Sequence, residues 1–496
     1  MDVLDIARWQ FAITTVYHFF YVPLTIGLAP LVAIMQTAWV RTGNERWLKL
    51  TKFFGKLLLI NFAIGVVTGI VQEFQFGMNW SEYSRFVGDV FGAPLAMEAL
   101  AAFFIESTFL GLWIFGWDKL PKKIHLACIW AVAVATNLSA YFILAANSWM
   151  QHPVGAIFNP ETGRAEMNDI WAVLTNNTLL AAFPHTITAA WLTAGTFVAG
   201  IGAWWMVREV RRGRTEVARD VYRPAVILGL VVMIVSGAGI AISGDAQAKL
   251  MFQQQPMKMA AAEALCESSP NGAPFSILTL GNLANDCENV THVLEIPGLT
   301  SFLADGSFTA PLPGIDEVQQ QMEERYGDTD AAGNPVDYAP NLALTYWSFR
   351  LMIGLGVGSA LLAVMALWLT RKGRVSDSTW LARIGLIAIP TPFLASSFGW
   401  IFTEAGRQPW VVVPNPTGID QIRMLTENGV SLAQGAGVVF ASMAIFTLVY
   451  TVLTVVWGRL IWRYMVEGAP ETVHDDSPDT RSDDDDTADR PLSFAY

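Results

Sequence analysis

The sequence is short of charge, cysteine and histidine. Only 15% of its 496 residues are charged and 53% are hydrophobic, whereas soluble proteins carry about 25% charged residues. This shortage argues against an ordinary soluble protein. There is no Cys-x-x-Cys-His segment, which excludes an attached c-type haem. No internal repeat is evident, and Asp2 and Asp5 stand where a cleavable signal peptide would have basic residues.

Long apolar runs recur along the chain instead. Each has about 20 residues or more, enough to cross roughly 30 Å of hydrocarbon as a helix. The sequence therefore predicts an all-α integral membrane protein with nine transmembrane helices. The predicted helices cover residues 10–40, 53–76, 91–116, 124–149, 177–207, 221–243, 342–370, 381–403 and 432–461.

Lysine and arginine gather in alternate connections between these helices, beginning with the connection between the first and the second. Because cytoplasmic loops collect basic residues, this pattern predicts the amino terminus outside and the carboxy terminus in the cytoplasm. The predicted organisation is six helices in 1–243, an extracytoplasmic loop in 244–341, three helices in 342–463 and a tail in 464–496. Residues 467–496 carry a net charge of −8, out of −12 for the chain, and their composition predicts a disordered, solvated extension.

The long loop holds two of the three cysteines, Cys266 and Cys287. On an oxidising face a disulfide between them is permitted, and two free thiols are the alternative. Cys128, within the fourth predicted helix, is expected to be a small core residue.

Polar residues at membrane depth are costly, so each needs a partner or a function. The orientation places His18, His185, Met352 and Glu404 in the outer half of four different helices. Haem iron takes axial His, Met or anionic oxygen ligands, so this shared depth predicts haem sites. Taken singly, each residue could instead be an ordinary core residue. The six histidines are too few for a haem-copper oxidase, because only some of them lie in helices. The other polar residues at this depth are Glu73, Glu98, Glu106 and Arg350.

Five segments resemble the large subunit of cytochrome bd quinol oxidases, and the resemblance extends over all nine predicted helices. It implies three haems: a low-spin haem b, a high-spin haem b and a chlorin-type haem d that binds oxygen. The segments are QFAITTVYHFFYVP at 10–23, EFQFGMNW at 73–80, FGAPLAMEALAAFFIEST at 91–108, NSWMQ at 147–151 and GWIFTEAGRQPW at 399–410.

The resemblance also implies residue roles. His185 and Met352 match the axial ligands of the low-spin haem, with Arg350 beside them, and this haem passes electrons. His18 and Glu404 match the remaining axial ligands, and which of the two holds haem d stays open. Arg407 and Trp400 are also expected to bind the cofactors. Trp400 is expected to lie between two haems, and the alternative is that it is an interfacial anchor.

Four more residues are expected to act in catalysis. Glu98 and Glu106 lie eight residues apart, about 12 Å along a helix, and the resemblance makes them proton stations from the inner side. The alternative is that both carboxylates are satisfied structurally. Lys258 and Glu263 match residues of the family's quinol-binding loop, where a carboxylate can accept a quinol proton. For an isolated Lys and Glu, a solvated surface pair is the alternative.

The implied function is oxidation of quinol at the outer face and reduction of O2 to water, with a proton-motive force from charge separation and without pumping. The implied location is a bacterial cytoplasmic membrane, and the implied partners are the lipid bilayer, a second membrane subunit and, in some members, a single-helix accessory chain. No nucleic-acid partner is expected. Ubiquinol and menaquinol stay open as donors. The alternatives are a proton-coupled transporter and a non-catalytic haem b anchor.

Overall fold

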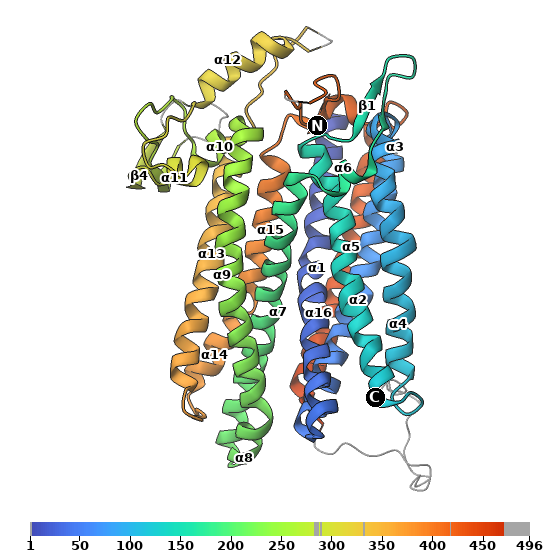
Figure 1. Ribbon diagram of the computed structural model, residues 1–496, viewed down its shortest axis with the longest axis vertical. Coiled ribbons are helices and arrows are strands. Elements are labelled where there is room, and N and C mark those ends of the chain that lie inside the picture. Colours follow the sequence, from blue (N-terminus) through green and yellow to red (C-terminus); the bar gives the residue numbers. More distant parts are fainter. Residues whose placement is uncertain (1, 282–286, 288–289, 331–332, 417, 471–496) are drawn as a thin grey trace.

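The computed structural model describes residues 2–281, 287, 290–330, 333–416 and 418–470. Within these residues it contains nine helical segments that are long and apolar enough to cross a membrane, which confirms the predicted all-α membrane fold (Figure 1). The segments are Val3–Thr42, Glu45–Met78, Ser81–Phe115, Lys122–Gln151, Ile170–Arg211, Thr215–Gln254, Leu342–Thr370, Thr379–Ala405 and Ala436–Glu467.

Several of these segments contain more than one element. The helices are α1 (Val3–Thr42), α2 (Glu45–Met78), α3 (Ser81–Met97), the π-helix η1 (Glu98–Phe103), α4 (Phe104–Phe115), α5 (Lys122–Gln151), α6 (Ile170–Leu174), α7 (Asn177–Arg211), α8 (Thr215–Val217), the π-helix η2 (Ala218–Tyr222), α9 (Arg223–Gln254), α10 (Pro256–Glu263), α11 (Leu299–Asp305), α12 (Ile315–Tyr326), α13 (Leu342–Thr370), α14 (Thr379–Ala388), α15 (Pro390–Ala405), the 3-10 helix η3 (Thr426–Gly429) and α16 (Ala436–Glu467). Three antiparallel strand pairs join β1 (Ala156–Asn159) to β2 (Arg164–Met167), β3 (Phe275–Leu280) to β4 (Thr291–Ile296) and β5 (Trp410–Val412) to β6 (Met424–Leu425).

Local sequence sets where the first helices begin and end. The Asp2 side chain accepts a hydrogen bond from the Asp5 N–H at 2.8 Å and caps α1. Gly43 ends α1 in the left-handed region, with φ of 67°. The Asn44 side chain then caps α2 by accepting from the Arg46 N–H. The chain therefore reverses direction within three residues.

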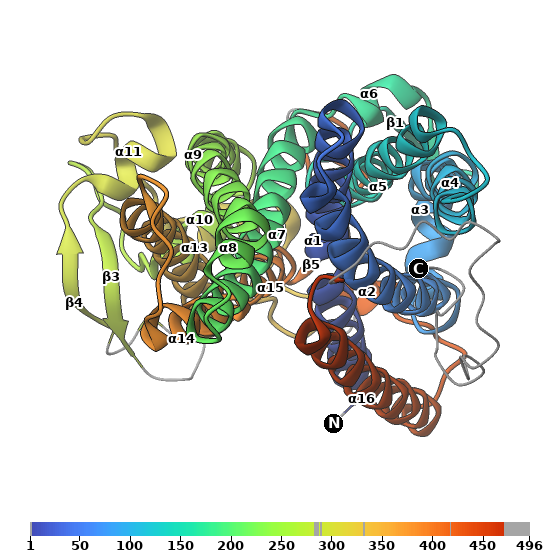
Figure 2. The same cartoon turned by 90° about the horizontal axis from the view of Figure 1, so that it is seen from below.

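Seen along the helices, the molecule has two groups (Figure 2). One contains α7, α9, α13 and α15, and the other contains α1, α2, α4 and α5. Helix α1 packs against α7 and α15 as well as α2 and α5, so it joins the groups, and α16 packs on α1 and α2. Buried side chains such as Leu28, Phe54 and Phe197 form the core between these helices. The polar residues considered below lie on helices that meet at this junction.

Helix α9 is longer than predicted. The apolar run ends near residue 243, but helical hydrogen bonding continues to Gln254. Gln, Lys and Ala are good helix formers, so the helix extends beyond its apolar part. The connection to α13 therefore begins with α10 rather than with an irregular segment. At the other end of the chain α16 stops at Glu467, and residues 471–496 of the predicted tail lie outside the described residues.

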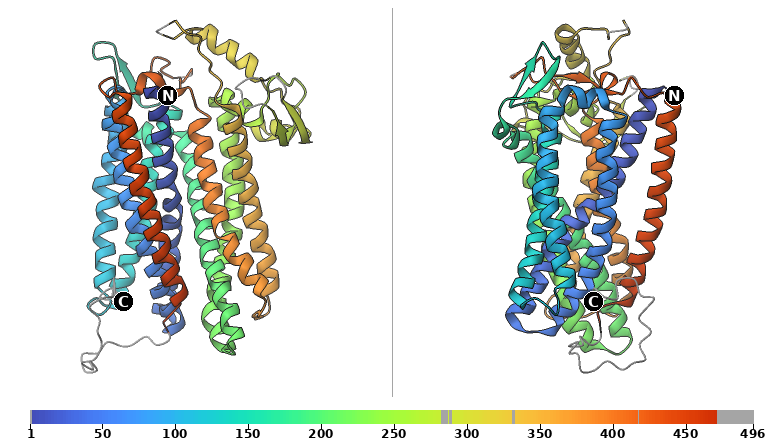
Figure 3. Two further views of the ribbon diagram at one scale, coloured as in Figure 1. Left: turned by 180° about the vertical axis from the view of Figure 1, so that it is seen from behind. Right: turned by 90° about the vertical axis from the view of Figure 1, so that its right-hand side faces the viewer.

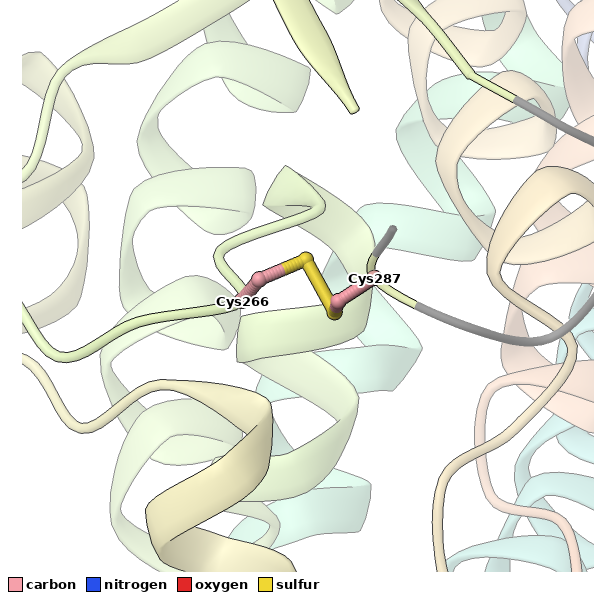
Figure 4. The surroundings of a disulfide bond; sticks show 2 residues. All are labelled: Cys266 and Cys287. Carbon is pink, nitrogen blue, oxygen red and sulfur yellow. A yellow bond between two sulfur atoms is a disulfide. The ribbon is translucent and has the colours of Figure 1, made fainter. Parts of the chain in front are cut away.

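The connection between α9 and α13 folds beyond the ends of the helices, at the end of the molecule where α1 begins (Figures 1 and 3). It contains the β3–β4 hairpin, α11 and α12. Cys266 and Cys287 form a disulfide within it (Figure 4). Cys128 is a buried free thiol in the core, as expected.

The disulfide should stabilise this connection. It links residues 21 positions apart, and closing a loop of this size lowers the entropy of the unfolded chain by an amount worth about 3 kcal/mol. Cys266→Ser, Cys287→Ser and the double variant should therefore all speed proteolytic cleavage between α10 and α12, and to the same extent, because each removes the same bond. Timed proteolysis followed by mass spectrometry measures this. Equal cleavage rates in wild type and variants would contradict the prediction.

Candidate active site

One cavity of about 420 Å3 lies among α1, α2, α3, α4, α5 and α15. Its volume falls within the range of roughly 300–1,000 Å3 that is usual for cofactor and ligand pockets. Most of its wall is apolar. The predicted site residues that line it are His18, Glu98, Glu106, Trp400, Glu404 and Arg407, and Glu73, Ser139 and Asn147 line it as well. The cavity therefore brings together six site residues from widely separated parts of the sequence.

His18 lines this cavity, and a hydroxyl of α2 holds its ring. Its Nδ1 lies 2.9 Å from the Thr68 hydroxyl. When that hydroxyl donates its single hydrogen to the Ile64 carbonyl at 2.9 Å, it accepts from the imidazole. In this arrangement Nδ1 carries the proton, and Nε2 keeps its lone pair. This is the usual arrangement around a ligating histidine.

His185 on α7 repeats the pattern. Its Nδ1 lies 3.1 Å from the Ser243 hydroxyl of α9, and that hydroxyl donates to the Gly239 carbonyl at 2.7 Å. Nε2 is again left as the ligating nitrogen. Hydroxyl residues on neighbouring helices thus set the same tautomer for both histidines.

Met352 on α13 is half-buried against α15. A Cβ on Gly399 would lie 2.8 Å from its sulfur, so glycine is needed there for the thioether to keep its position. Helix α9 packs against both α7 and α13. His185 and Met352 do not line the 420 Å3 cavity. His185 lies against α9, and Met352 lies against α15.

The Glu404 carboxylate has a donor on each oxygen. Asn147 Nδ2 donates to Oε1 at 2.7 Å, and Arg407 donates to Oε2 from Nε at 3.2 Å and from Nη2 at 2.5 Å. The same arginine also donates from Nη1 to the Val411 carbonyl. Glu404 is therefore held in a fixed orientation in the wall of the cavity.

Trp400 on α15 stacks on Phe19 of α1, with ring centroids 4.7 Å apart. Its indole N–H is buried and has no hydrogen-bond partner among the described residues. An unpaired buried donor on a cavity wall is costly without a ligand or water. Trp400 thus lies on the cavity wall and between two helices of the bundle.

Glu98 and Glu106 both line the cavity, Glu98 from the first residue of the π-helix η1 and Glu106 from the first turn of α4. The Ser139 hydroxyl of α5 donates to Glu98 Oε1 at 2.7 Å. Glu106 is buried. A π-turn changes the rotation along the helix, and π-turns occur often at functional sites. The π-turn lets Glu98 and Glu106, which are eight residues apart, face the same cavity.

Lys258 is not on the surface. Its side chain is 5% exposed, and Nζ donates to Gln151 Oε1 at 3.2 Å and to the Thr403 carbonyl at 3.0 Å. Burial lowers the pKa of the Lys258 ammonium to about 7, despite the opposing effect of Glu404. It lines a second pocket of about 190 Å3 together with Gln255, Tyr326 and Trp410. At neutral pH this lysine can both hold and release a proton.

Glu263 is 2% exposed and does not contact Lys258 in the way that a surface pair would. It forms an ion pair with Arg350 of α13, with Oε2 2.6 Å from Nη2, and accepts from the Thr300 hydroxyl at 3.0 Å. Arg350 also donates from Nε to the Ser276 carbonyl at 2.5 Å. The solvated surface pair is therefore excluded. Glu263 and Arg350 tie α10 and the β3–β4 hairpin to the helix that carries Met352.

These donors fit haem better than a bare metal ion. Within the described ranges, no three His, Cys, Asp or Glu side chains cluster closely enough to chelate a metal by themselves. A porphyrin supplies four ligands of its own and needs only axial ones. Single imidazoles with a free Nε2, one thioether and one anionic carboxylate are suitable axial ligands. The residues present therefore fit haem groups.

Comparisons with known proteins show the family of the chain. The family model described as cytochrome bd terminal oxidase subunit I matches residues 6–469. The chain belongs to this family. It is 45% identical over 478 residues to cytochrome bd ubiquinol oxidase subunit 1 of Bacillus subtilis (strain 168), covering 96% of this chain and 97% of that protein.

Two further relatives extend the comparison. Cytochrome bd-II ubiquinol oxidase subunit 1 of Escherichia coli (strain K12) is 39% identical, covering 83% of this chain and 88% of that one. The solved bd oxidase structure from Geobacillus thermodenitrificans has a TM-score of 0.78 at 25% identity, covering 94% of this chain and 99% of that chain. As a member of the cytochrome bd family with nine membrane-length helices among its described residues, the chain is a multi-pass membrane protein and a terminal oxidase subunit.

Reasoning from sequence missed the residues that orient this bd oxidase site. Thr68 and Ser243 give no signal, because hydroxyl residues are common in membrane helices. Asn147 and Gln151 stand in the NSWMQ segment, whose spacing puts both amides on one face of α5. That spacing is the signal that could have found them.

Proposed function

We propose that this chain is the haem-bearing subunit of a quinol:oxygen oxidoreductase. The overall reaction converts two quinols and one O2 into two quinones and two waters. The observation that carries the proposal is the 420 Å3 cavity in which His18 and Glu404 meet the carboxylates of Glu98 and Glu106. An oxygen-reducing site needs metal ligands and a supply of protons in one water-poor space, and these residues provide both.

Haem b and haem d, when bound, supply the electron transfer and the activation of oxygen. His18 and Glu404 would hold the two haems of the cavity, and His185 and Met352 would hold the low-spin haem. Thr68 and Ser243 would hold the two imidazoles by their Nδ1 atoms. Arg407 and Asn147 would hold the Glu404 carboxylate in place, and the Trp400 N–H is a donor for a polar group of a bound haem.

Glu98 and Glu106 would hand protons to the cavity. Both carboxylates line it, and Ser139 orients Glu98. The basic loops place the far ends of these helices in the cytoplasm. Protons for water formation then come from the inside, and the reaction builds a membrane potential without a pump.

Quinol would bind beside Lys258 in the 190 Å3 pocket, where Tyr326 and Trp410 offer aromatic contacts. A lysine with a pKa of about 7 can take the hydroxyl proton of the quinol at neutral pH. Glu263 would act indirectly by holding Arg350. A second membrane subunit would complete the complex, as the subunit 1 designation of the relatives implies.

The optical spectrum of the dithionite-reduced, purified complex tests this function, together with quinol-dependent oxygen uptake. The oxidase should show haem b bands, a red chlorin band and oxygen consumption. A transporter would be colourless, and a haem b anchor would lack both the chlorin band and oxygen uptake. Either of those results would reject the proposal.

Lys258→Met should lower kcat/KM for quinol by about 10²-fold, because it removes the proton acceptor and the charge from the pocket. The haem bands should be unchanged. Lys249→Met is the matched control, since Lys249 is a partly exposed residue of α9 that pairs with Asp245. Wild-type kcat/KM in the Lys258 variant would move the quinol site elsewhere.

A further inference from the structure

The two pockets are connected by one chain of side-chain hydrogen bonds. Lys258 Nζ, in the wall of the 190 Å3 pocket, donates to Gln151 Oε1 at 3.2 Å. Gln151 Nε2 donates to Asn147 Oδ1 at 2.9 Å. Asn147 Nδ2 donates to Glu404 Oε1 at 2.7 Å, in the wall of the 420 Å3 cavity. Gln151 lines neither pocket, so the chain crosses the protein between them.

Every bond in this chain runs in the same direction, from Lys258 toward Glu404. Gln151 turns its oxygen toward Lys258 and its nitrogen toward Asn147. Asn147 turns its nitrogen toward Glu404. The two amides then meet with nitrogen against oxygen. Reversing either amide would place two acceptors or two donors against each other at one of its ends.

We propose that Asn147 and Gln151 form a proton barrier between the quinol pocket and the oxygen cavity. A side-chain amide has no titratable proton at physiological pH. To pass a proton, the amide would have to accept one proton on its oxygen and lose another from its nitrogen. It would then have to return to its starting form, which the direction of the hydrogen bonds opposes. The hydrogen bonds therefore hold Glu404 in place and do not conduct protons.

A second connection between the two pockets has the same property. Arg407 lines both of them and binds Glu404 on the cavity side. A guanidinium stays protonated in proteins, so it cannot exchange protons as a relay. The Gln255 amide is the other side chain that donates to Gln151 Oε1, at 3.4 Å. Each of these connections between the two pockets therefore passes through an amide or a guanidinium group.

The barrier rests on the proposed function, because that function requires the protons released from quinol to be kept out of the oxygen cavity. Quinol releases protons at one face of the membrane, and oxygen reduction consumes protons from the other. Protons that crossed directly from the Lys258 pocket to the cavity would be consumed without any charge crossing the membrane. The enzyme would then reduce oxygen but build no potential.

The test introduces titratable groups into the chain. Asn147→Asp and Gln151→Glu each leave one amide in place, whereas the double variant completes a chain of groups that can exchange protons. The purified complex is reconstituted into liposomes with a short-chain quinol, and membrane potential and oxygen uptake are recorded together. Because Asn147 also holds Glu404, the readout is the ratio of membrane potential to oxygen uptake and not the rate of uptake itself. The singles should keep the wild-type ratio, and the double variant should lose most of it.

A double variant that stays coupled, or a single that leaks as much as the double, would overturn the barrier. Failure of the wild type to consume oxygen would instead reject the function on which it rests. The reduced haem spectrum reports whether the variants assemble. If two added carboxylates prevent assembly, Asn147→Asp with Gln151→His takes their place, because it adds one carboxylate and still completes the chain.

Discussion

The Met352→Leu substitution should remove the low-spin haem spectrum and lower quinol oxidation by about 100-fold or more. Changes to groups that merely orient a metal ligand typically cost about 10- to 100-fold in activity, and loss of a ligand should cost at least as much. Leucine has nearly the volume of methionine, so the fold should lose less than about 1.5 kcal/mol. The reduced-minus-oxidised spectrum and the rate of oxygen uptake measure the two effects.

Met365→Leu is the matched control for this variant. It makes the same chemical change on the same helix, but at a residue that is 54% exposed on the outside of the bundle. It should leave both spectrum and rate unchanged. A Met352 variant with the wild-type low-spin bands would show that the thioether is not an axial ligand, and the region around His185 would need another partner.

Hydrophobic length was sufficient to predict the nine membrane-length helices found in the described part of the chain. Each helix needs about 20 apolar residues to cross the bilayer, and few other features of a sequence produce such runs. The ends were less predictable. Polar residues continue α9 to Gln254, because helix formation does not depend on apolar character.

The candidate site was predictable as a set of residues but not as a set of contacts. His18, Glu98, Glu106 and Glu404 stand out in the sequence because ionisable groups are rare in membrane helices. Which of them share a cavity depends on how the helices pack, and the sequence of a single segment does not determine that packing. The π-turn at Glu98 likewise follows from packing and has no signature in the helix pattern.

The loop residues show the same limit most clearly. Lys258 and Glu263 are close in sequence and are both charged, which by itself favours a solvated pair. In the fold they separate: Lys258 joins the amide chain that leads to Glu404, and Glu263 binds Arg350. Long-range partners decide the role of a buried charge, because each buried charge must be paired wherever the fold brings a partner.

The Glu106→Gln substitution should slow oxygen reduction by about 10²-fold or more, because a positioned proton donor contributes roughly 10²–10⁴-fold to rate. Glu106 is buried in the cavity wall, and glutamine keeps its size but cannot carry a proton. The haem spectrum should therefore stay as in wild type while steady-state oxygen uptake falls. This combination separates a proton role from a ligand role.

Glu82→Gln provides the comparison for Glu106→Gln. Glu82 lies on α3 of the same membrane segment and pairs with the exposed Arg85, and surface pairs of this kind contribute about 0–1 kcal/mol. The same change there should leave the rate at the wild-type level. If Glu106→Gln also turned over at that level, protons would have to reach the cavity by another route, and the structural alternative for the carboxylates of η1 and α4 would hold. If instead Glu106→Gln slowed the enzyme and Glu98→Gln did not, the route would enter the cavity at Glu106 alone, and Glu98 with its Ser139 partner would be a structural neighbour.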